Sequence, residues 1–568
     1  MSAGLVLAVD VGTRSARACV FALDGTRRGA PAAEPIDVRH PPGAPHLYEQ
    51  SSEQIWHAVC AAARRALASA GEGSASAVVG VGFDATCSLV VGPGQPVSPP
   101  AAAPHAEGEV VNDVILWLCH RAEAEADAIN HTRHAALRTV GGHVSPEMQM
   151  PKLLWLKRYR PDSFAAARHF FDLADFLTFR ATWHDGAAPC RSACTLGCKW
   201  NFGASSDGWD DNFLEAIGLA ELAAEAHARI GPATPHALGA PVGNGLCASA
   251  ADALGGLRVG IAVSAGAIDA HAGALGCLGS ARALDRSAAL ISGTSTCVMH
   301  HAVAARVVPG VWGPYRDGAV PGFFLLEGGQ SATGELVEHL VTAHPAVAEL
   351  RAALAARGLA DAPTSALLAE LSARALAAAG CGSPAEYGRA ALLTRSLHVY
   401  PDFAGNRSPL ADSHMRGAVI GLSLDGHSVE ALCALYVSAL LALCCQLRHV
   451  LDEMSDGAGS PIEQLCCTGG LASDRLFLAL LADASGREVV AVAEPNACLL
   501  GAAMLGAVAA GAHASVAEAM RAMTAPPAAT IAPTCDPALR AFHAAKRRVY
   551  RRMLEDQRAY RELMDAAS

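Results

Sequence analysis

The sequence has little charge, few aromatic side chains and no excess of basic residues. Only 17% of its 568 residues are charged, 5% are aromatic, and the formal net charge is -11. Proteins that hold nucleic acids need Lys and Arg to displace the counterions of the phosphates, so a nucleic-acid partner is not expected. Small anionic ligands remain possible, because local backbone dipoles and a metal ion can hold them.

We expect neither a leader nor a membrane span. The N-terminus has no basic region followed by a cleavage site. The most apolar run, residues 431–445, is shorter than a bilayer span and favours a buried core helix. The 18 cysteines include the adjacent pairs Cys444–Cys445 and Cys466–Cys467, a pattern typical of reduced thiols. We therefore expect a soluble, cytoplasmic protein without a membrane partner.

Two common patterns of nucleotide and metal sites are missing or incomplete. There is no P-loop, and the string Gly-x-Gly-x-x-Ala at 80–85 is only part of a dinucleotide fingerprint. Cys190, Cys194 and Cys198 recur every fourth residue and could share a helical face. Without a close fourth ligand, this spacing favours small core residues over a zinc site.

The length and composition predict two large α/β domains. A chain of 568 residues exceeds one typical core, and 52% of the residues are hydrophobic. Strand-like and helical segments alternate along the chain, which is typical of α/β proteins. We place the boundary near residue 285, giving domains 1–285 and 286–568. The predicted elements include helices at 52–68 and 350–379, strands at 78–83 and 461–468, and a charged helix at the C-terminus.

A strand–turn–strand pattern occurs twice. Predicted strands at 5–11 and 16–23 flank a first Gly-Thr turn, and a predicted strand at 288–292 enters a second one. Glycine permits the tight backbone, and the following N–H groups and hydroxyls can face phosphates. The pair suggests a duplicated fold that grips one nucleotide from both sides. The residues assigned to the phosphates are Gly12, Thr13 and Arg14, and Gly293, Thr294 and Ser295.

Two aspartates stand where the chain changes direction. Asp10 ends the first strand, where a carboxylate could bind Mg²⁺ directly or through water, or could stabilise the turn. Asp269 follows a glycine-containing segment and begins a helix of small residues, so it could be an N-cap or a general base. Asp10 and the two turns favour the base. His271 is expected to be a satisfied neighbour rather than a ligand.

A third glycine-rich segment follows a predicted strand in the second half. Gly469 and Gly470 would let a flat adenine approach the backbone. Ser473 and Asp474 come next and could cap the following helix or contact the nucleoside. We assign Gly469, Gly470 and Asp474 to nucleotide binding.

Together these motifs resemble the FGGY family of carbohydrate kinases, over essentially the whole chain. The resemblance includes Asp10-Val-Gly-Thr, Asp269 with its approach, and the segments 292–295, 327–330, 401–409 and 469–470. Within the family, the D-ribulokinase branch is similar in further strings, which occupy residues 82–88, 147–152, 171–176, 198–200, 208–211 and 309–314.

The resemblance implies two actin/hexokinase-type (ribonuclease H-like) ATPase domains with an interdomain cleft. It implies ATP and Mg²⁺ as cofactors and transfer of a phosphoryl group to the terminal hydroxyl of a ketopentose, with D-ribulose giving D-ribulose 5-phosphate. Asp269 would be the base, and Asp10 and Asp269 would hold the metal. A homodimer is a further expectation from the family.

The resemblance also implies the sugar contacts, which are Asp84, Trp117, Lys199, Asp269 and Glu327. A lysine can donate to sugar oxygens and a glutamate can accept from hydroxyls. The alternatives are a surface lysine, an N-cap or turn contact for the glutamate and a core position for the tryptophan.

The chain departs from the family pattern at three positions. Cys119 stands where the family often has an acid near Arg121, Asn406 stands where many members have Glu, and Asp474 stands where Asn is common. The substrate alternatives are L-ribulose, D-xylulose or a pentitol such as ribitol. The alternative of a different class is a non-catalytic actin-fold regulator that binds a nucleotide.

Overall fold

The structure is a computed structural model. It describes residues 4–41, 43–98, 110–183, 189–204, 207–232, 234–359 and 361–567. Strands and helices alternate through most of this part of the chain, which confirms the predicted α/β class.

The chain forms two compact units that interleave in the sequence. The first unit comprises Met1–Ser280, His301–Leu326 and Asn496–Ala525, and the second comprises Ala281–His300, Glu327–Pro495 and Pro526–Ser568. The division at residue 285 stays a prediction. It did not include the return of residues 496–525, from late in the chain, to the first unit.

The first unit is built on a six-stranded sheet. Its order is β10-β5-β1-β2-β3, and β9 also pairs with β5. β1 and β2 form the predicted antiparallel hairpin, whereas β5 is parallel to β1, β9 and β10. The carboxyl ends of β1, β5 and β10 therefore meet at one edge. The bounds are β1 Leu5–Val11, β2 Ser15–Ala22, β3 Arg27–Pro35, β5 Val78–Ala85, β9 Ala262–Val263 and β10 Ala267–Ile268.

A four-stranded sheet and thirteen described helices complete this unit. The small sheet has the order β4-β7-β6-β8 and comprises β4 Glu49–Gln50, β6 Leu89–Gly92, β7 Val114–Ile115 and β8 His169–Asp172. The helices are α1 Ser52–Ala70, α2 Ser74–Ala77, α3 Glu123–His131, α4 Gln149–Tyr159, α5 Pro161–Ala166, α6 Leu173–Thr182, α7 Ala193–Lys199, α8 Asp211–Ala216, α9 Ala220–Ala224, α10 Ala248–Ala253, α11 Asp269–Leu278, α17 Ala497–Ala509 and α18 Val516–Met523.

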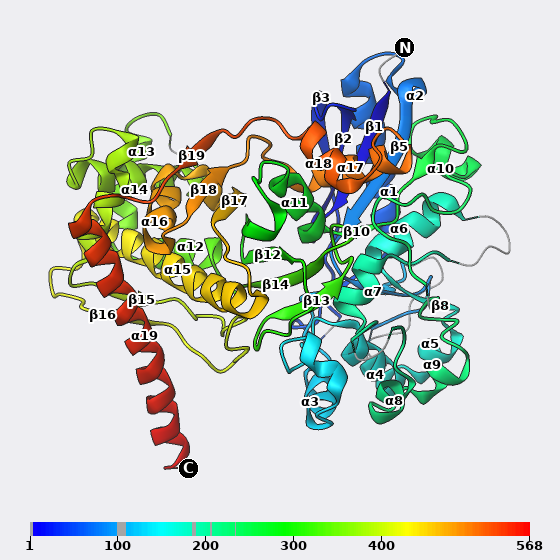
Figure 1. Ribbon diagram of the computed structural model, residues 1–568, viewed down its shortest axis with the longest axis horizontal. Coiled ribbons are helices and arrows are strands. Elements are labelled where there is room, and N and C mark those ends of the chain that lie inside the picture. Colours follow the sequence, from blue (N-terminus) through cyan, green and yellow to red (C-terminus); the bar gives the residue numbers. More distant parts are fainter. Residues whose placement is uncertain are drawn as a thin grey trace. The chain divides into compact units, whose positions relative to one another are not determined.

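Glycines bring α17 into close contact with β5. A Cβ atom at Gly82 would lie 1.9 Å from the carbonyl oxygen of Ala502, and one at Gly80 would lie 2.2 Å from that of Gly506. In Figure 1 the orange helices α17 and α18 lie over the blue strands of this sheet. The glycines of the partial fingerprint therefore serve helix–strand packing.

The second Gly-Thr turn lies in a seven-stranded sheet. Its order is β13-β14-β12-β11-β17-β18-β19. β11 pairs antiparallel with β12 and parallel with β17, which repeats the arrangement of β1 with β2 and β5. The bounds are β11 Ser287–Ser292, β12 Thr296–Ala302, β13 Trp312–Arg316, β14 Phe324–Gln330, β17 Gln464–Thr468, β18 Glu488–Ala491 and β19 Ala529–Ile531. This repeat is the duplication that the turns predicted.

One of the predicted helices among the remaining elements is divided in the structure. The segment 350–379 forms two helices rather than one, because the chain leaves the helix after Ala355 and re-enters it after Pro363. These elements are α12 Gly334–Thr342, α13 Val347–Ala355, α14 Thr364–Ala378, α15 Val429–Ala458, α16 Arg475–Ser485, α19 Pro537–Asp565 and the paired strands β15 His398–Tyr400 and β16 Ala418–Ile420.

The apolar run 431–445 belongs to a longer helix than its composition indicated. The segment Val429–Gly457 is long and apolar enough to cross a membrane by length and composition, but 83% of its most apolar 18-residue window is buried. Such burial is what a core helix of a folded domain requires. The expected core helix is therefore confirmed. The expectation that it is too short to span a membrane is wrong, because the helix extends beyond residues 431–445 at both ends.

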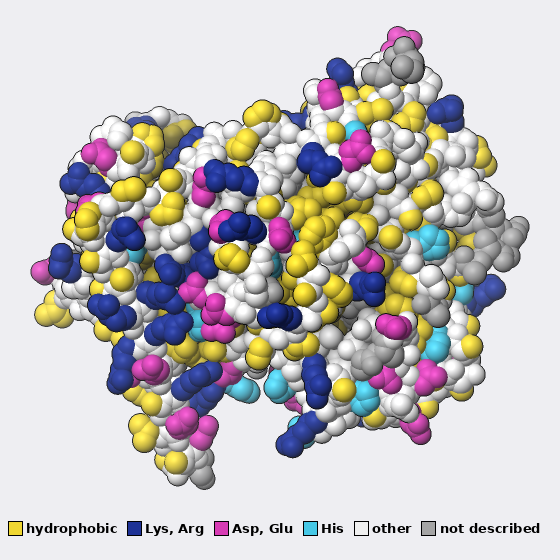
Figure 2. All heavy atoms as spheres, in the orientation of Figure 1, with side chains coloured by type: hydrophobic (Ala, Val, Ile, Leu, Met, Phe, Trp, Pro, Cys, Tyr) yellow, Lys and Arg dark blue, Asp and Glu magenta, His cyan; other side chains and the backbone are white. Residues whose placement is uncertain are grey.

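The C-terminal helix α19 carries many arginines. Figure 2 shows dark-blue Lys and Arg side chains gathered over it and the neighbouring helices. Leu539, Tyr550 and Met553 on α19 are buried, while Arg548 is exposed and Arg547 pairs with Asp452 at 2.7 Å. The predicted solvated face therefore includes at least one specific ion pair.

Candidate active site

Three aspartates lie at the carboxyl edge of the first sheet. Asp10 on β1 is the register partner of Asp84 on β5, and Asp84 is in turn the partner of Ala267 on β10. Asp269 follows β10 directly and is the first residue of α11. Parallel strands end at the same edge, so residues far apart in sequence converge there. The fold thus brings together the predicted metal ligand, the predicted base and a predicted sugar contact.

The three carboxyl groups share a weakly solvated environment. Burial raises the pKa of Asp10, against the opposing charge of Arg17. Burial, followed by the charges of Asp10 and Asp269, holds the pKa of Asp84 well above its usual range. Burial and then the charge of Asp10 raise the pKa of Asp269 to about 6, although Lys199 and Arg17 lower it. A carboxyl group with such a pKa is a suitable base near neutral pH.

Asp269 does not cap its helix in the usual way. Ile268 occupies the N-cap position without a side-chain bond, and the Asp269 Oδ1 accepts from the N–H of Ala270 at 2.7 Å. The side chain is half-buried. The N-cap alternative is therefore wrong, because Ile268 holds that position. The role of Asp269 as a base stays a prediction.

Arg17 is a residue that the sequence reasoning missed. It lies opposite Asp10 in the β1–β2 hairpin and forms an ion pair with the Asp10 carboxylate. Arg14, which was assigned to the phosphates, is exposed in the turn. The signal that could have found Arg17 is the antiparallel pairing across the turn, which sets each residue of β1 against one of β2.

The donor set at this edge fits a magnesium ion. Oδ1 of Asp10 and both side-chain oxygens of Asp84 are buried without a hydrogen-bond partner. Three ionised carboxyl groups beside Arg17 and Lys199 leave an excess of negative charge that a cation offsets. In the described part of the chain, the carboxylates of these three residues are not a group of metal-ligand atoms within 4.8 Å of one another. This suits Mg²⁺, which usually keeps several waters and takes only one or two carboxylates.

The first Gly-Thr turn contacts a predicted sugar residue. The Gly12 N–H donates to the Ser15 carbonyl at 3.0 Å, which closes the turn. The indole Nε1 of Trp117 donates to the Thr13 hydroxyl at 3.0 Å, and Trp117 is half-buried. Gln50 donates to the Thr13 carbonyl at 2.8 Å. Thr13 and Trp117 therefore lie together, and the side chain of Trp117 is not confined to the core.

Lys199 ends α7 and lies near Asp269. The residue is 5% exposed, so the alternative of a surface lysine is wrong. Its Nζ stands 4.2 Å from the centre of the Trp312 ring, a cation–π contact. Its charge lowers the pKa of Asp269 and of Cys87. Trp312 was part of a family string but was not assigned to the site, because only folding sets β13 beside α7.

The second Gly-Thr turn is exposed, and a backbone hydrogen bond from Thr333 holds it. Gly293 and Thr294 are exposed, and the Gly293 N–H donates to the Ser295 carbonyl at 2.8 Å. The N–H of Thr333 donates to the Thr294 carbonyl at 2.8 Å. Thr333, which sequence reasoning missed, thus holds the backbone of the turn, while Gly293 and Thr294 stay exposed.

Glu327, Gly469 and Gly470, the next predicted residues of the second unit, differ in how closely the surrounding chain packs against them. Glu327 is 5% exposed in the middle of β14, so it is neither an N-cap nor a turn residue. Gly469 has φ +95°, and a Cβ there would lie 2.3 Å from the Ser292 carbonyl oxygen, whereas Gly470 faces open space. Gly469 therefore needs to be glycine for the fold, and Gly470 leaves room for a ligand.

Both carboxylate oxygens of Asp474 accept hydrogen bonds from within the second unit. It is the N-cap of α16, with Oδ1 accepting from the Leu476 N–H at 2.9 Å. Its Oδ2 accepts from the hydroxyls of Ser372 at 2.8 Å and Tyr436 at 2.7 Å. The capping alternative is thus confirmed for Asp474. For Ser473 it is wrong, because its hydroxyl donates to the Gly470 carbonyl instead.

Two departures from the family pattern have local explanations. The Nε of Arg121 lies 3.1 Å from the Cys119 sulfur, and the same guanidinium pairs with the buried Glu49 at 2.9 Å. Glu49 therefore balances the charge of Arg121, which an acid at position 119 would otherwise balance. Asn406 donates to the Asp402 carboxylate and accepts from the Leu410 N–H at 3.0 Å, so it orders its own loop.

A buried polar cluster that the sequence reasoning missed lies near Cys87. Gln149 donates to the Cys87 carbonyl and to Asp172, each at 3.0 Å. Burial raises the pKa of Asp172 to about 8 and lowers the pKa of Lys152. Gln149 and Lys152 lie in a family string at 147–152, which was the available signal.

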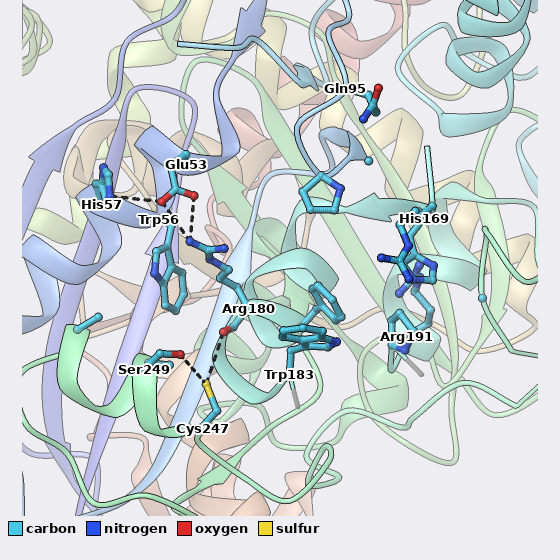
Figure 3. A pocket seen from close by; sticks show the side chains of 18 of the residues that line it. Glu53, Trp56, His57, Gln95, His169, Arg180, Trp183, Arg191, Cys247 and Ser249 are labelled. Carbon is cyan, nitrogen blue, oxygen red and sulfur yellow. Dashed lines mark hydrogen bonds and ion pairs between the residues drawn. The ribbon is translucent and has the colours of Figure 1, made fainter. Parts of the chain in front are cut away.

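A pocket of the first unit lies apart from these residues. It has a volume of about 1340 Å³ and is lined by residues such as Trp56, Phe179, Arg180 and Arg191. Figure 3 shows Arg180 between Trp56 and Trp183, paired with Glu53. None of the predicted site residues lines this pocket.

Comparison with known proteins shows the family of this chain. The model for the N-terminal domain of the FGGY family of carbohydrate kinases matches residues 5–276, and the model for the C-terminal domain matches residues 288–510. The chain belongs to the FGGY family of carbohydrate kinases. The protein is therefore a sugar kinase.

Relatives of this FGGY kinase match it along most of its length. An FGGY carbohydrate kinase domain-containing protein of Danio rerio is 42% identical over 577 residues, covering 100% of both chains. The human protein of the same description is 40% identical and covers 98% of this chain and 97% of its own. The D-ribulokinase of Saccharomyces cerevisiae is 35% identical and covers 85% of this chain and 68% of its own.

Solved structures confirm the two-domain fold. A xylulose kinase from Rhodospirillum rubrum superposes with a TM-score of 0.72 at 22% identity, covering 98% of this chain and 99% of its own. A glycerol kinase from Plasmodium falciparum, solved with ADP, gives a TM-score of 0.71 at 14% identity and covers 98% of both chains.

Proposed function

We propose that this FGGY kinase phosphorylates D-ribulose to D-ribulose 5-phosphate, using ATP and Mg²⁺. The observation that carries the proposal is the position of Asp269. A half-buried carboxyl group with a pKa of about 6 stands at the strand edge beside Asp10 and Asp84. A base in that position is what transfer from a nucleotide to a sugar hydroxyl requires.

Asp269 takes the proton from the terminal hydroxyl of the sugar as the reaction proceeds. The O–H bond breaks, the sugar oxygen bonds to the γ-phosphorus, and the bond from that phosphorus to the ADP oxygen breaks. Lys199 and Trp117 orient the sugar, with Glu327 and Asp84 as further contacts. Lys199 also keeps Asp269 ionised, because its positive charge lowers the pKa of that carboxyl group.

The two Gly-Thr turns hold the phosphates of ATP in this proposal. Gly12, Thr13 and Arg14 contribute from the first turn, and Gly293, Thr294 and Ser295 from the second. Gly470 offers open space for the nucleoside, next to Gly469. Asp10 and Asp269 would hold Mg²⁺ through water, and the ion would neutralise charge that develops on the phosphate oxygens.

The choice of D-ribulose rests on the relatives. The yeast protein called D-ribulokinase is 35% identical over 515 residues, whereas a ribulokinase of Shouchella clausii is 31% identical over 443 residues. The stronger and longer match supports D-ribulose. We further propose a cytoplasmic enzyme, because adjacent cysteine pairs such as Cys444–Cys445 are typical of reduced thiols. A homodimer without nucleic-acid or membrane partners completes the proposal.

A coupled assay of ADP release tests the proposal. The purified protein is offered D-ribulose, L-ribulose, D-xylulose and ribitol with ATP and Mg²⁺, and kcat/KM is compared. We expect D-ribulose to give the highest value. A higher value for another sugar would overturn the substrate, and no stimulation by any of them would overturn the proposed pentose-kinase activity.

A further inference from the structure

Two cysteines and a histidine converge inside the first unit, outside the proposed magnesium site. Cys194 and Cys198 lie on α7, and His271 lies on α11. Their ligand atoms, the two sulfurs and one ring nitrogen, are all within 4.8 Å of one another. The three residues are buried, with exposed fractions of 0%, 1% and 0%.

The local structure explains why these residues meet. Cys194 and Cys198 are four residues apart on α7, so their side chains share one face of the helix. α11 is held in place by its packing on α17, where a Cβ at Gly276 would lie 2.1 Å from the Ala497 carbonyl oxygen. Cys190 lies before α7 and interacts with His236, which lowers its pKa, so it is not part of the group.

The chemistry of this donor set points to one class of metal. Sulfur and imidazole ligands suit zinc, and two cysteines with one histidine are a known three-residue set that leaves a fourth position open. In a tetrahedral zinc site the ligand atoms lie about 3.5–3.8 Å apart, so small side-chain movements would bring these donors into place.

We propose that Cys194, Cys198 and His271 bind one Zn²⁺ ion. Binding deprotonates the two thiols and releases two protons, and the neutral imidazole donates its lone pair. Two thiolates balance the charge of Zn²⁺, so the complex is neutral, which favours it at a buried position over a monovalent ion with the same ligands. The inference does not depend on the proposed sugar.

A zinc ion at this site would connect the helices α7 and α11. Lys199 follows Cys198 at the end of α7, and Asp269 precedes His271 by two residues at the start of α11. A metal bound to both helices would tie together the elements that carry Lys199 and Asp269. Binding to the folded state alone also raises stability by mass action.

Metal analysis of the purified, untagged protein tests the proposal. We expect about one zinc ion per chain in the wild type, as for a single three-ligand site. Cys194→Ser and Cys198→Ser should each lose it. Cys60→Ser, which removes a buried thiol of α1 outside the group, should retain it. Equal zinc in all four proteins would overturn the proposal, as would only trace zinc in a wild type refolded with Zn²⁺.

Cobalt provides a second measurement that does not depend on the folding of the variants. Wild-type protein refolded under reducing conditions with Co²⁺ should show thiolate-to-cobalt charge-transfer absorption and the visible bands of tetrahedral cobalt. A spectrum of octahedral, oxygen-bound cobalt would overturn the proposal. The melting temperature of the zinc-loaded wild type should also fall when a zinc chelator is added, while that of Cys194→Ser should not change.

Discussion

Asp10 and Asp84 are register partners on the parallel strands β1 and β5, and both carboxyl groups are buried. Both have raised pKa values, and neither oxygen of Asp84 has a hydrogen-bond partner. Two adjacent carboxyl groups in a weakly solvated place repel each other when both are ionised. The strand edge is therefore destabilised until a proton or a cation reaches it.

Asp84→Asn should stabilise the metal-free protein at pH 8. The pKa of Asp84 is higher in the folded than in the unfolded state, so ionisation at high pH costs folding free energy, and that cost disappears as the pH falls towards 4. We expect the melting temperature to rise by a few degrees at pH 8, with a smaller difference at pH 5.

Asp113→Asn is the matched control for this prediction. Burial also raises the pKa of Asp113, but its carboxylate accepts from the Ser52 N–H, the Ser52 hydroxyl and the Gly94 N–H. An amide cannot accept all three, so this variant should melt at a lower temperature. An equal loss in both variants would contradict the account of Asp84.

Asp269→Asn should lower kcat by at least about 10²-fold, the low end of the contribution of a general base. The circular dichroism spectrum and melting temperature should stay close to those of the wild type. Asp127→Asn, at an exposed position of α3, should leave kcat unchanged. Near-normal turnover of Asp269→Asn would exclude the proposed base.

The rate should depend on pH through the same residue. The base must be ionised, so kcat/KM should fall about tenfold per unit as the pH drops below about 6. Because the charge of Arg17 lowers the pKa of Asp269, Arg17→Gln should move this inflection to higher pH. An inflection that stays at the same pH would show that Arg17 does not act on the base.

Loss of the buried ion pair between Arg121 and Glu49 should lower the free energy of unfolding more than replacement of Cys119. Glu49→Gln leaves a buried guanidinium without its counter-charge and should reduce the free energy of unfolding by about 3–5 kcal/mol. Cys119→Ser keeps an acceptor for Arg121 and should cost at most about 1 kcal/mol. Urea denaturation measures both, and equal losses would argue against the compensating role of Glu49.

The two adjacent glycines at 469 and 470 should respond differently to alanine. Gly469→Ala meets the Ser292 backbone at a positive φ and should destabilise the fold. Gly470→Ala enters open space, so the melting temperature should not change. If the nucleoside lies there, KM for ATP should rise about tenfold, which corresponds to 1.4 kcal/mol. An unchanged KM would remove Gly470 from the nucleotide site.

Much of the first hairpin could be predicted from the sequence because its determinants are local. The alternation of strands, the Gly-Thr turn and the place of Asp10 all follow from residues within one short segment. Arg17 was missed although it lies in the same hairpin, since its meaning depends on which residue stands opposite. Trp312 and Thr333 were missed because their partners, Lys199 and the second turn, come from other elements.

The sequence by itself determined the duplicated strand–turn–strand units and, through its motifs, the family. Only the tertiary structure decided that Asp10, Asp84 and Asp269 share one edge, and that α17 returns to the first sheet against Gly80 and Gly82. The physical reason is that turns and caps depend on neighbours in sequence. The pKa of a carboxyl group depends on burial and on charges that only folding brings near.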